Sequence, residues 1–102
     1  MTITAITKET RFDSYIDVVI GKMRPRQREV LAYLIKRGPR TAREISFALF
    51  GTTDRSLVHP RLNELVGMGL VAVTGKKMDS ITGKMCAVYG ATEAAHEAQA
   101  RA

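Results

Sequence analysis

The sequence predicts a single, mainly α-helical domain that carries a small antiparallel β-hairpin towards its C-terminal end. A chain of 102 residues with 45% hydrophobic and 25% charged residues has the size and composition of one globular domain with a modest core. Apolar residues recur at helical spacing in four segments as far as Gly67. From Leu70 onward the apolar period changes to two, which predicts strands.

Residues 10–23 are expected to form the first helix, after a flexible segment at 1–9. Thr10 and Asp13 have the spacing of a capping box. The helix would carry one apolar stripe, made of Phe12, Tyr15, Ile16, Val19, Ile20 and Met23. This stripe either covers the core of its own subunit or pairs with a second copy, which would make a homodimer through Phe12, Tyr15, Ile16 and Val19.

Two further helices are predicted by their end signals. Pro25 suits the first turn of the second helix, and Gly38 followed by Pro39 ends it. Its buried stripe is Val30, Leu31, Leu34 and Ile35. Thr41 and Glu44 form the capping box of the third helix, which ends at Gly51. Its expected buried face is Ala42, Ile45, Ala48 and Leu49.

A polar turn at 51–54 leads into the fourth helix, which ends at Gly67. A start at Asp54 would put Pro60 inside the helix, where it costs about 3 kcal/mol. We therefore expect the helix to begin near Ser56 or Leu57. Its inner face is expected to hold Val58, Leu62, Leu65 and Val66.

Two strands are expected after the fourth helix, at 70–74 and 85–89, joined by a polar loop at 75–84. The predicted domain therefore spans residues 10–91. Residues 92–102 form a helical or frayed tail, with Thr92 as its N-cap and little apolar surface to dock it.

The positive charge is concentrated in one third of the chain. The formal net charge is +6. The segment from Lys22 to Glu44 contains eight basic residues and only two acidic ones, Glu29 and Glu44, so it carries the whole excess of positive charge. Such a concentration suits a polyanionic partner, because neutralised phosphates release counterions. A solvated basic helix face gives the same count.

At this point the chain resembles the winged helix-turn-helix family, in particular its small MarR-like and phage-type regulators. The resemblance spans residues 25–90. It rests on Thr41-Ala42-Arg43-Glu44-Ile45, Arg61-Leu62-Asn63-Glu64-Leu65, Gly69-Leu70-Val71, Thr82-Gly83-Lys84 and Val88-Tyr89. It implies a transcriptional regulator that binds double-stranded DNA, with the helix at 56–67 in the major groove and the wing at 75–84 on the backbone or minor groove.

The outer face of the fourth helix supplies the candidate base contacts, because arginine and asparagine pair with guanine and adenine edges. These residues are Arg55, Ser56, His59, Arg61 and Asn63, with Asn63 ranked last because it lies furthest from the N-terminal end. Candidate backbone or wing contacts are Arg40, Thr41, Arg43, Lys76, Lys77 and Lys84. Each could instead be a solvated surface group.

Catalytic and metal chemistry find little support. Asp54, Ser56 and His59 have the residue types of a triad but lie on one short segment. Glu93 and His96 give one copy of a motif that needs two. With two histidines and one cysteine we expect no metal, no cofactor and no enzyme. Cys86 is expected to be a small buried strand residue, with a redox switch as the alternative.

Neither a long apolar run nor a secretory signal is present in the sequence, so we expect no membrane contact and a cytoplasmic location. A second function stays open, that of a winged-helix adaptor which binds a protein of the transcription or replication machinery without reading DNA. Phe47 and Phe50 are not both needed on a short buried face, so they would form its exposed patch. Binding of RNA or single strands is disfavoured by the low aromatic content of 6%.

Overall fold

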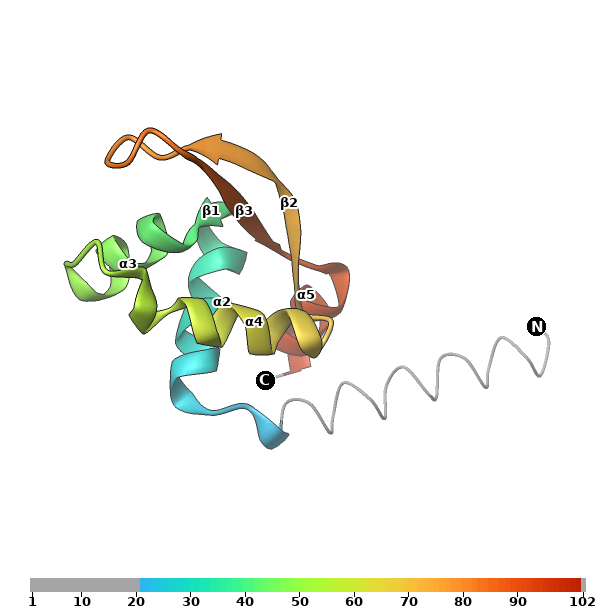
Figure 1. Cartoon of the computed structure of the whole chain (residues 1–102). Coiled ribbons are helices and arrows are strands. Elements are labelled where there is room, and N and C mark those ends of the chain that lie inside the picture. Colours follow the sequence, from blue (N-terminus) through green and yellow to red (C-terminus); the bar gives the residue numbers. More distant parts are fainter. Residues whose placement is uncertain (1–20, 102) are drawn as a thin grey trace.

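The computed structural model describes residues 21–101, which form four α-helices, one 3₁₀ turn and a three-stranded antiparallel sheet (Figure 1). This agrees with the prediction of a mainly helical domain with a small hairpin. The segment at 1–9 and nearly all of the predicted helix at 10–23 lie outside the described residues, and so do the side chains of Phe12, Tyr15, Ile16 and Val19.

Helix α2 (Pro25–Arg37) has the predicted ends. Pro25 occupies the first turn, and Gly38 ends the helix with a φ of 83°, a value that glycine adopts without steric cost. Its buried side includes one polar residue, Gln27, which is 4% exposed. The Gln27 side chain accepts from the Arg24 backbone N–H at 2.9 Å and donates to Glu64 Oε1 at 3.0 Å, so burial leaves it satisfied.

Helix α3 (Ala42–Phe50) is capped as predicted. Thr41 Oγ1 accepts from the Glu44 N–H at 3.2 Å, and Glu44 Oε1 accepts from the Thr41 N–H at 2.9 Å. The prediction that Ala48 faces the core is wrong, because Ala48 is exposed and Ser46 is buried in its place. The Ser46 hydroxyl tolerates burial because it donates to the Asp54 carbonyl at 2.7 Å.

The fourth predicted helix is divided into a 3₁₀ turn η1 (Arg55–Leu57) and helix α4 (His59–Gly67). The predicted start near Ser56 is therefore too early. Starting at His59 puts Pro60 in the first turn, where its missing N–H costs nothing. Leu62 and Leu65 are fully buried as expected, but Val66 is 40% exposed. Val66 therefore lies at the edge of the inner face of α4, where its side chain is exposed.

The sheet has the order β1-β3-β2. Strands β2 (Val71–Met78) and β3 (Met85–Ala91) form the predicted hairpin, and the two-residue strand β1 (Arg40–Thr41), which was not predicted, pairs with β3. The connecting loop covers only 79–84, so Lys76 and Lys77 lie in β2 and not in the loop. After Val71, β2 is exposed throughout, since the hairpin projects beyond the helices (Figure 1).

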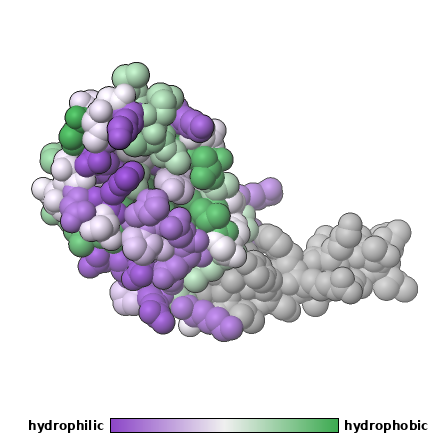
Figure 2. Space-filling view, in the orientation of Figure 1, coloured by the Kyte–Doolittle hydropathy of each residue, from purple (hydrophilic) through white to green (hydrophobic). Residues whose placement is uncertain are grey.

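Helix α5 (Glu93–Arg101) follows Thr92, whose hydroxyl accepts from the Ala95 N–H at 3.3 Å. Its docking uses small side chains, because Ala95 and Ala98 are buried in the same core as Leu31 and Leu34 of α2. The molecular face in Figure 2 is largely hydrophilic, and its apolar surface is divided into small patches. The core cluster draws on α2, α3, α4 and α5 and on Val71 and Tyr89 of the two hairpin strands, so the core lies between the helices and the base of the hairpin.

Candidate nucleic-acid interface

A cleft separates the start of α4 from strand β3, and we call it the helix–hairpin cleft. It has a volume of about 160 Å³. Arg43 of α3, Arg55 of η1 and His59 of α4 line one side, and β3 forms the other. The His59 ring packs edge-on against Tyr89, with ring centres 6.5 Å apart and planes at 84°. The cleft thus brings together two of the predicted base-contacting residues, Arg55 and His59.

The exposed part of this region is the N-terminal approach to α4. Arg55 and Ser56 are exposed there and His59 is half-buried, while Asn63 is exposed further along α4. Asp54 Oδ1 accepts from the Ser56 N–H at 3.0 Å and fixes the turn that precedes η1. Hydrogen bonds from the Ser56 side chain and backbone lower the pKa of Asp54 below its usual range. Arg55 makes no ion pair with another residue of the described range 21–101.

Arg61 does not join this group. Its side chain is 31% exposed, and its Nε lies 2.8 Å from Glu64 Oε1. Glu64 in turn accepts from Gln27 of α2. Arg61 therefore belongs to a polar network between α4 and α2, and the exposed polar side chain in the middle of α4 is Asn63. The preference for Arg61 over Asn63 overlooked the i,i+3 spacing of Arg61 and Glu64 within α4, which the sequence shows. Only the bond from Gln27 to Glu64 comes from another helix.

The predicted backbone contacts fall into two groups. Lys76 and Lys84 are exposed, and neither forms an ion pair within the described part of the chain. Arg40 is half-buried and donates to the Pro39 carbonyl at 2.8 Å. Thr41 is only 7% exposed, and its hydroxyl is occupied by the α3 cap. Lys76, Lys84 and Arg40 thus keep donors available, whereas Thr41 does not.

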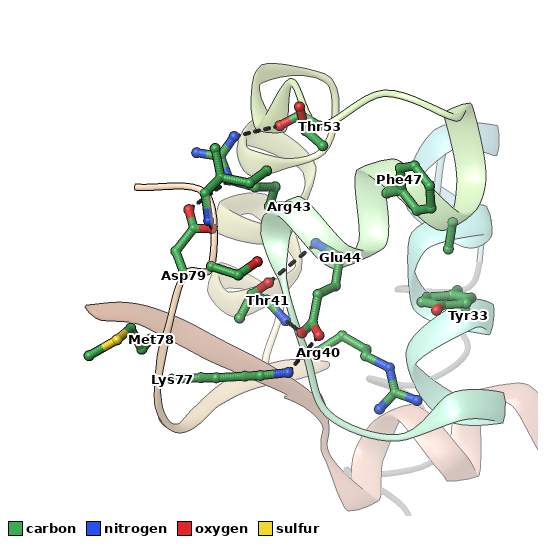
Figure 3. Close-up of a pocket in the computed structure, with 13 residues that line it drawn as sticks. Tyr33, Arg40, Thr41, Arg43, Glu44, Phe47, Thr53, Lys77, Met78 and Asp79 are labelled. Atoms are coloured by element: carbon green, nitrogen blue, oxygen red, sulfur yellow. Dashed lines mark hydrogen bonds and ion pairs between the residues drawn. The ribbon is translucent and has the colours of Figure 1, made fainter. Parts of the chain in front are cut away.

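The other two predicted contacts, Arg43 and Lys77, form ion pairs between α3 and the hairpin. Figure 3 shows both pairs around a pocket of about 520 Å³. Arg43 Nε lies 2.8 Å from Asp79 Oδ2, and Lys77 Nζ lies 2.7 Å from Glu44 Oε2. Partial burial raises the pKa of Glu44, but hydrogen bonds from Lys77 and Thr41 outweigh it, so the pKa lies below its usual 4.5.

Asp79 is the important residue of this region that the sequence reasoning missed. Its side chain is 6% exposed and accepts hydrogen bonds from the Ile81 N–H at 2.9 Å and from Thr82 Oγ1 at 3.2 Å. The hydrogen bond from the Ile81 N–H lowers the pKa of Asp79 most, and those from Arg43 and Thr82 lower it further. The available signal was an aspartate in a polar loop, where it commonly accepts from the N–H two residues on.

Two further expectations need correction. Cys86 lies in β3 as predicted but is half-buried and not buried, with Sγ 3.9 Å from Asp79 Oδ2. Phe50 does not share an exposed patch with Phe47. The Arg26 guanidinium covers the Phe50 ring at 4.4 Å from its centre, whereas Phe47 is 63% exposed. Phe47 instead borders the pocket of Figure 3, across from Met78.

Three further findings concern membrane spans, metal clusters and similarity to known proteins. Among residues 21–101 no helix is long and apolar enough to cross a membrane. Over the same range, histidine, cysteine and acidic side chains do not gather in threes to hold a metal ion. Comparisons with protein-family models, curated proteins and solved structures found no match to this chain.

Proposed function

We propose that this chain is a winged helix-turn-helix module that binds double-stranded DNA in the cytoplasm as a transcriptional regulator. The observation that supports this best is the helix–hairpin cleft, where the start of α4 and strand β3 meet around Arg55 and His59. Helices α3 and α4 are joined by residues 51–58, which include the 3₁₀ turn η1, and a hairpin follows them, in keeping with the resemblance to the winged helix-turn-helix family. The formal charge of +6 favours a polyanionic partner.

In this proposal α4 enters the major groove with its outer face towards the bases. Arg55, Ser56 and Asn63 supply exposed donors and acceptors for base edges. His59 lies deeper, against Tyr89, and contacts either a base edge or a phosphate from the cleft. Arg61 is reassigned to the network with Glu64 and is not proposed as a base contact.

Phosphate contacts come from the cations that have no ion-pair partner within the described residues. Lys76 pairs with Ala87 and Lys84 precedes Met85, and both Ala87 and Met85 line the cleft, while Arg40 pairs with Tyr89 at the foot of the sheet. Long cationic side chains on a hairpin reach the backbone or the adjacent minor groove. The hairpin would therefore act as the wing.

The direct test is selection of bound sequences from a random duplex pool, followed by titration of the selected duplex at increasing salt. We expect a defined site and an affinity that falls by roughly 10-fold or more between 50 and 200 mM salt, since several phosphates are neutralised. Arg55→Gln should relax preference at one base position. Lys36→Gln removes one positive charge from α2 away from the cleft, and it should leave the preferred sequence unchanged. A salt-independent affinity with no selected sequence would refute the proposal.

A homodimer forms part of the proposal. The apolar stripe that the sequence predicts for 10–23 includes Met23, which lines an apolar groove of about 210 Å³ together with Leu31, Ile35 and Ala98. A second copy binding there would place two half-sites about one helical turn apart. Sedimentation equilibrium tests this, and Ile16→Asp should convert a dimer to a monomer. A wild-type protein that remains monomeric at high concentration removes the dimer from the proposal.

A protein-binding adaptor is the second candidate function, and the exposure of Phe47 favours it. Met78 and Ile81, which are 63% and 59% exposed, border the same pocket, so apolar groups surround it. Replacing the two exposed candidate base contacts Arg55 and Asn63 together by alanine separates the two functions. Biological activity that survives this change in a folded protein supports the adaptor, whereas loss of activity supports DNA binding.

A further inference from the structure

Two ion pairs of opposite polarity join the hairpin to α3. Neighbouring residues of α3 supply one cation and one anion, Arg43 and Glu44, and β2 with the residue after it supplies Lys77 and Asp79. The separations are 2.8 Å for Arg43–Asp79 and 2.7 Å for Lys77–Glu44. Because the signs alternate along both elements, a shift of the hairpin would bring like charges together. The pairing therefore specifies one position of the hairpin.

Asp79 also organises the hairpin tip. Its carboxylate accepts from Ile81 and Thr82, while its backbone N–H donates to the Lys84 carbonyl at 2.8 Å and its carbonyl accepts from the Gly83 N–H at 2.7 Å. Gly83 has a φ of 72°, which closes the turn. The tip is thus a small rigid unit built around Asp79, and whatever holds Asp79 also holds the tip.

Arg43 extends the connection to the helix-turn-helix turn. While Nε contacts Asp79, Nη1 donates to the Thr53 carbonyl at 2.9 Å. Figure 3 shows the guanidinium lying between Thr53 and Asp79. Ser46, one turn further along α3, donates to the Asp54 carbonyl at 2.7 Å, so the same face of α3 fixes two successive carbonyls of the turn that leads into η1. One planar side chain therefore connects α3, the turn before η1 and the hairpin tip.

We infer that Arg43 and Asp79 form a latch that sets the position of the hairpin relative to α4, so that Arg43 is a positioning residue and not a phosphate contact. The consequence for DNA rests on the proposed function. If α4 lies in the major groove, the latch fixes where Lys84 and the tip meet the flanking backbone. The latch itself is a property of the free protein and can be tested without DNA.

Replacing Asp79 distinguishes the latch from direct phosphate binding by the sign of its effect. Asp79→Asn removes a negative charge from a DNA-binding surface and frees the Arg43 guanidinium. Electrostatics alone then predicts tighter binding to a polyanion. The latch predicts weaker binding. Without the latch the hairpin is ordered only when DNA binds, and the entropy lost in ordering it reduces the affinity. Glu29→Gln is a matched control, since it removes one carboxylate from the exposed surface of α2.

The experiment measures two quantities on wild-type, Asp79→Asn, Arg43→Lys and Glu29→Gln proteins. The first is the order of the Ile81 and Gly83 amides relative to α3, from NMR residual dipolar couplings without DNA. The second is the Kd and hydroxyl-radical footprint on the duplex selected by the wild type. We expect the tip to lose its fixed orientation in Asp79→Asn and in Arg43→Lys, and to keep it in Glu29→Gln. We also expect the Kd of Asp79→Asn and Arg43→Lys to rise about 10-fold, with protection lost at the flanks and kept at the centre.

Arg43→Lys keeps the charge but loses the planar fork that spans two partners, so it provides an answer even if Asp79→Asn fails to fold. An unchanged tip orientation in Arg43→Lys, or tighter DNA binding by a folded Asp79→Asn, would overturn the latch. A wild-type protein that binds no duplex refutes the proposed function alone, because the NMR comparison still decides whether the latch exists.

Discussion

Leu62 is the residue on which the seating of α4 depends most directly, and its replacement tests the orientation of the whole helix. Leu62 is 0% exposed and belongs to the same core cluster as Val30, Leu34, Ile45 and Leu65. Leu62→Ala removes three carbon groups, worth about 2.4 kcal/mol at about 0.8 kcal/mol each. The cavity left behind raises the expected loss to about 2–5 kcal/mol.

This loss is large for so small a domain, whose total stability is expected to be about 5–10 kcal/mol. With an m-value of about 1 kcal/mol/M, the urea midpoint should fall by at least about 2 M. Far-UV circular dichroism at 25 °C follows the transition. The structure thus predicts that Leu62→Ala retains a cooperative transition but has lost a large fraction of its stability.

Asn63→Ala provides the matched comparison at the next position of the same helix. Asn63 is exposed, so its replacement should change stability by no more than about 0.5 kcal/mol. Its effect should instead fall on the base preference of the DNA complex. Equal destabilisation by the two variants, or a larger loss from Asn63→Ala, would show that the inner and outer faces of α4 are misassigned.

Three further predictions concern the turn, the acid limb of stability and the charge of the cleft. Gly51 has a φ of 68°, so Gly51→Ala should lower the free energy of unfolding by about 1–2 kcal/mol. Gly67 is helical with open space around the new methyl group, so Gly67→Ala should raise the thermal midpoint, and equal changes of the midpoint in the two variants would contradict this assignment. Folding lowers the pKa of Glu44, so the contribution of Glu44 to stability is complete above the unfolded pKa of 4.5 and is lost as the pH falls through the lower, folded pKa. Lys77→Met removes the partner and should flatten this part of the curve of stability against pH, measured by urea unfolding. An unchanged slope would argue against the pair. Lys76→Ala, opposite the cleft residue Ala87, should reduce the salt dependence of DNA affinity by about one phosphate contact, and an unaltered slope in binding titrations would place Lys76 outside the interface.

Local signals account for what the sequence predicted well. Pro25 and Gly38 mark the two ends of α2, and Thr41 with Glu44 caps α3. Each signal acts through backbone groups within a few residues, so its meaning does not depend on the rest of the fold. The buried positions of α4 followed from periodicity, because only one face of a surface helix meets the core. Val66 was misplaced because it lies at the edge of that face.

The sheet was predicted less completely. Strand β1 has only two residues, and nothing in two residues shows a period. The outer half of β2 carries Lys76 and Lys77 and is exposed, so it lacks the alternation that marks a half-buried strand. Its extended form comes from backbone pairing with β3, in which Lys76 faces Ala87 and Lys77 faces Cys86. Such pairing is invisible to side-chain patterning.

The sequence by itself determined the order of the helices, the turn at Gly51, the hairpin and the strong positive charge, because these depend on neighbouring residues or on simple counts. Only the tertiary structure decided which charged groups are available to a ligand. Arg43 has the same residue type as Arg55, yet it is paired with Asp79 while Arg55 is exposed. The pairing of Arg43 joins residues 36 positions apart, and contacts at that separation arise from packing of whole elements and not from local sequence.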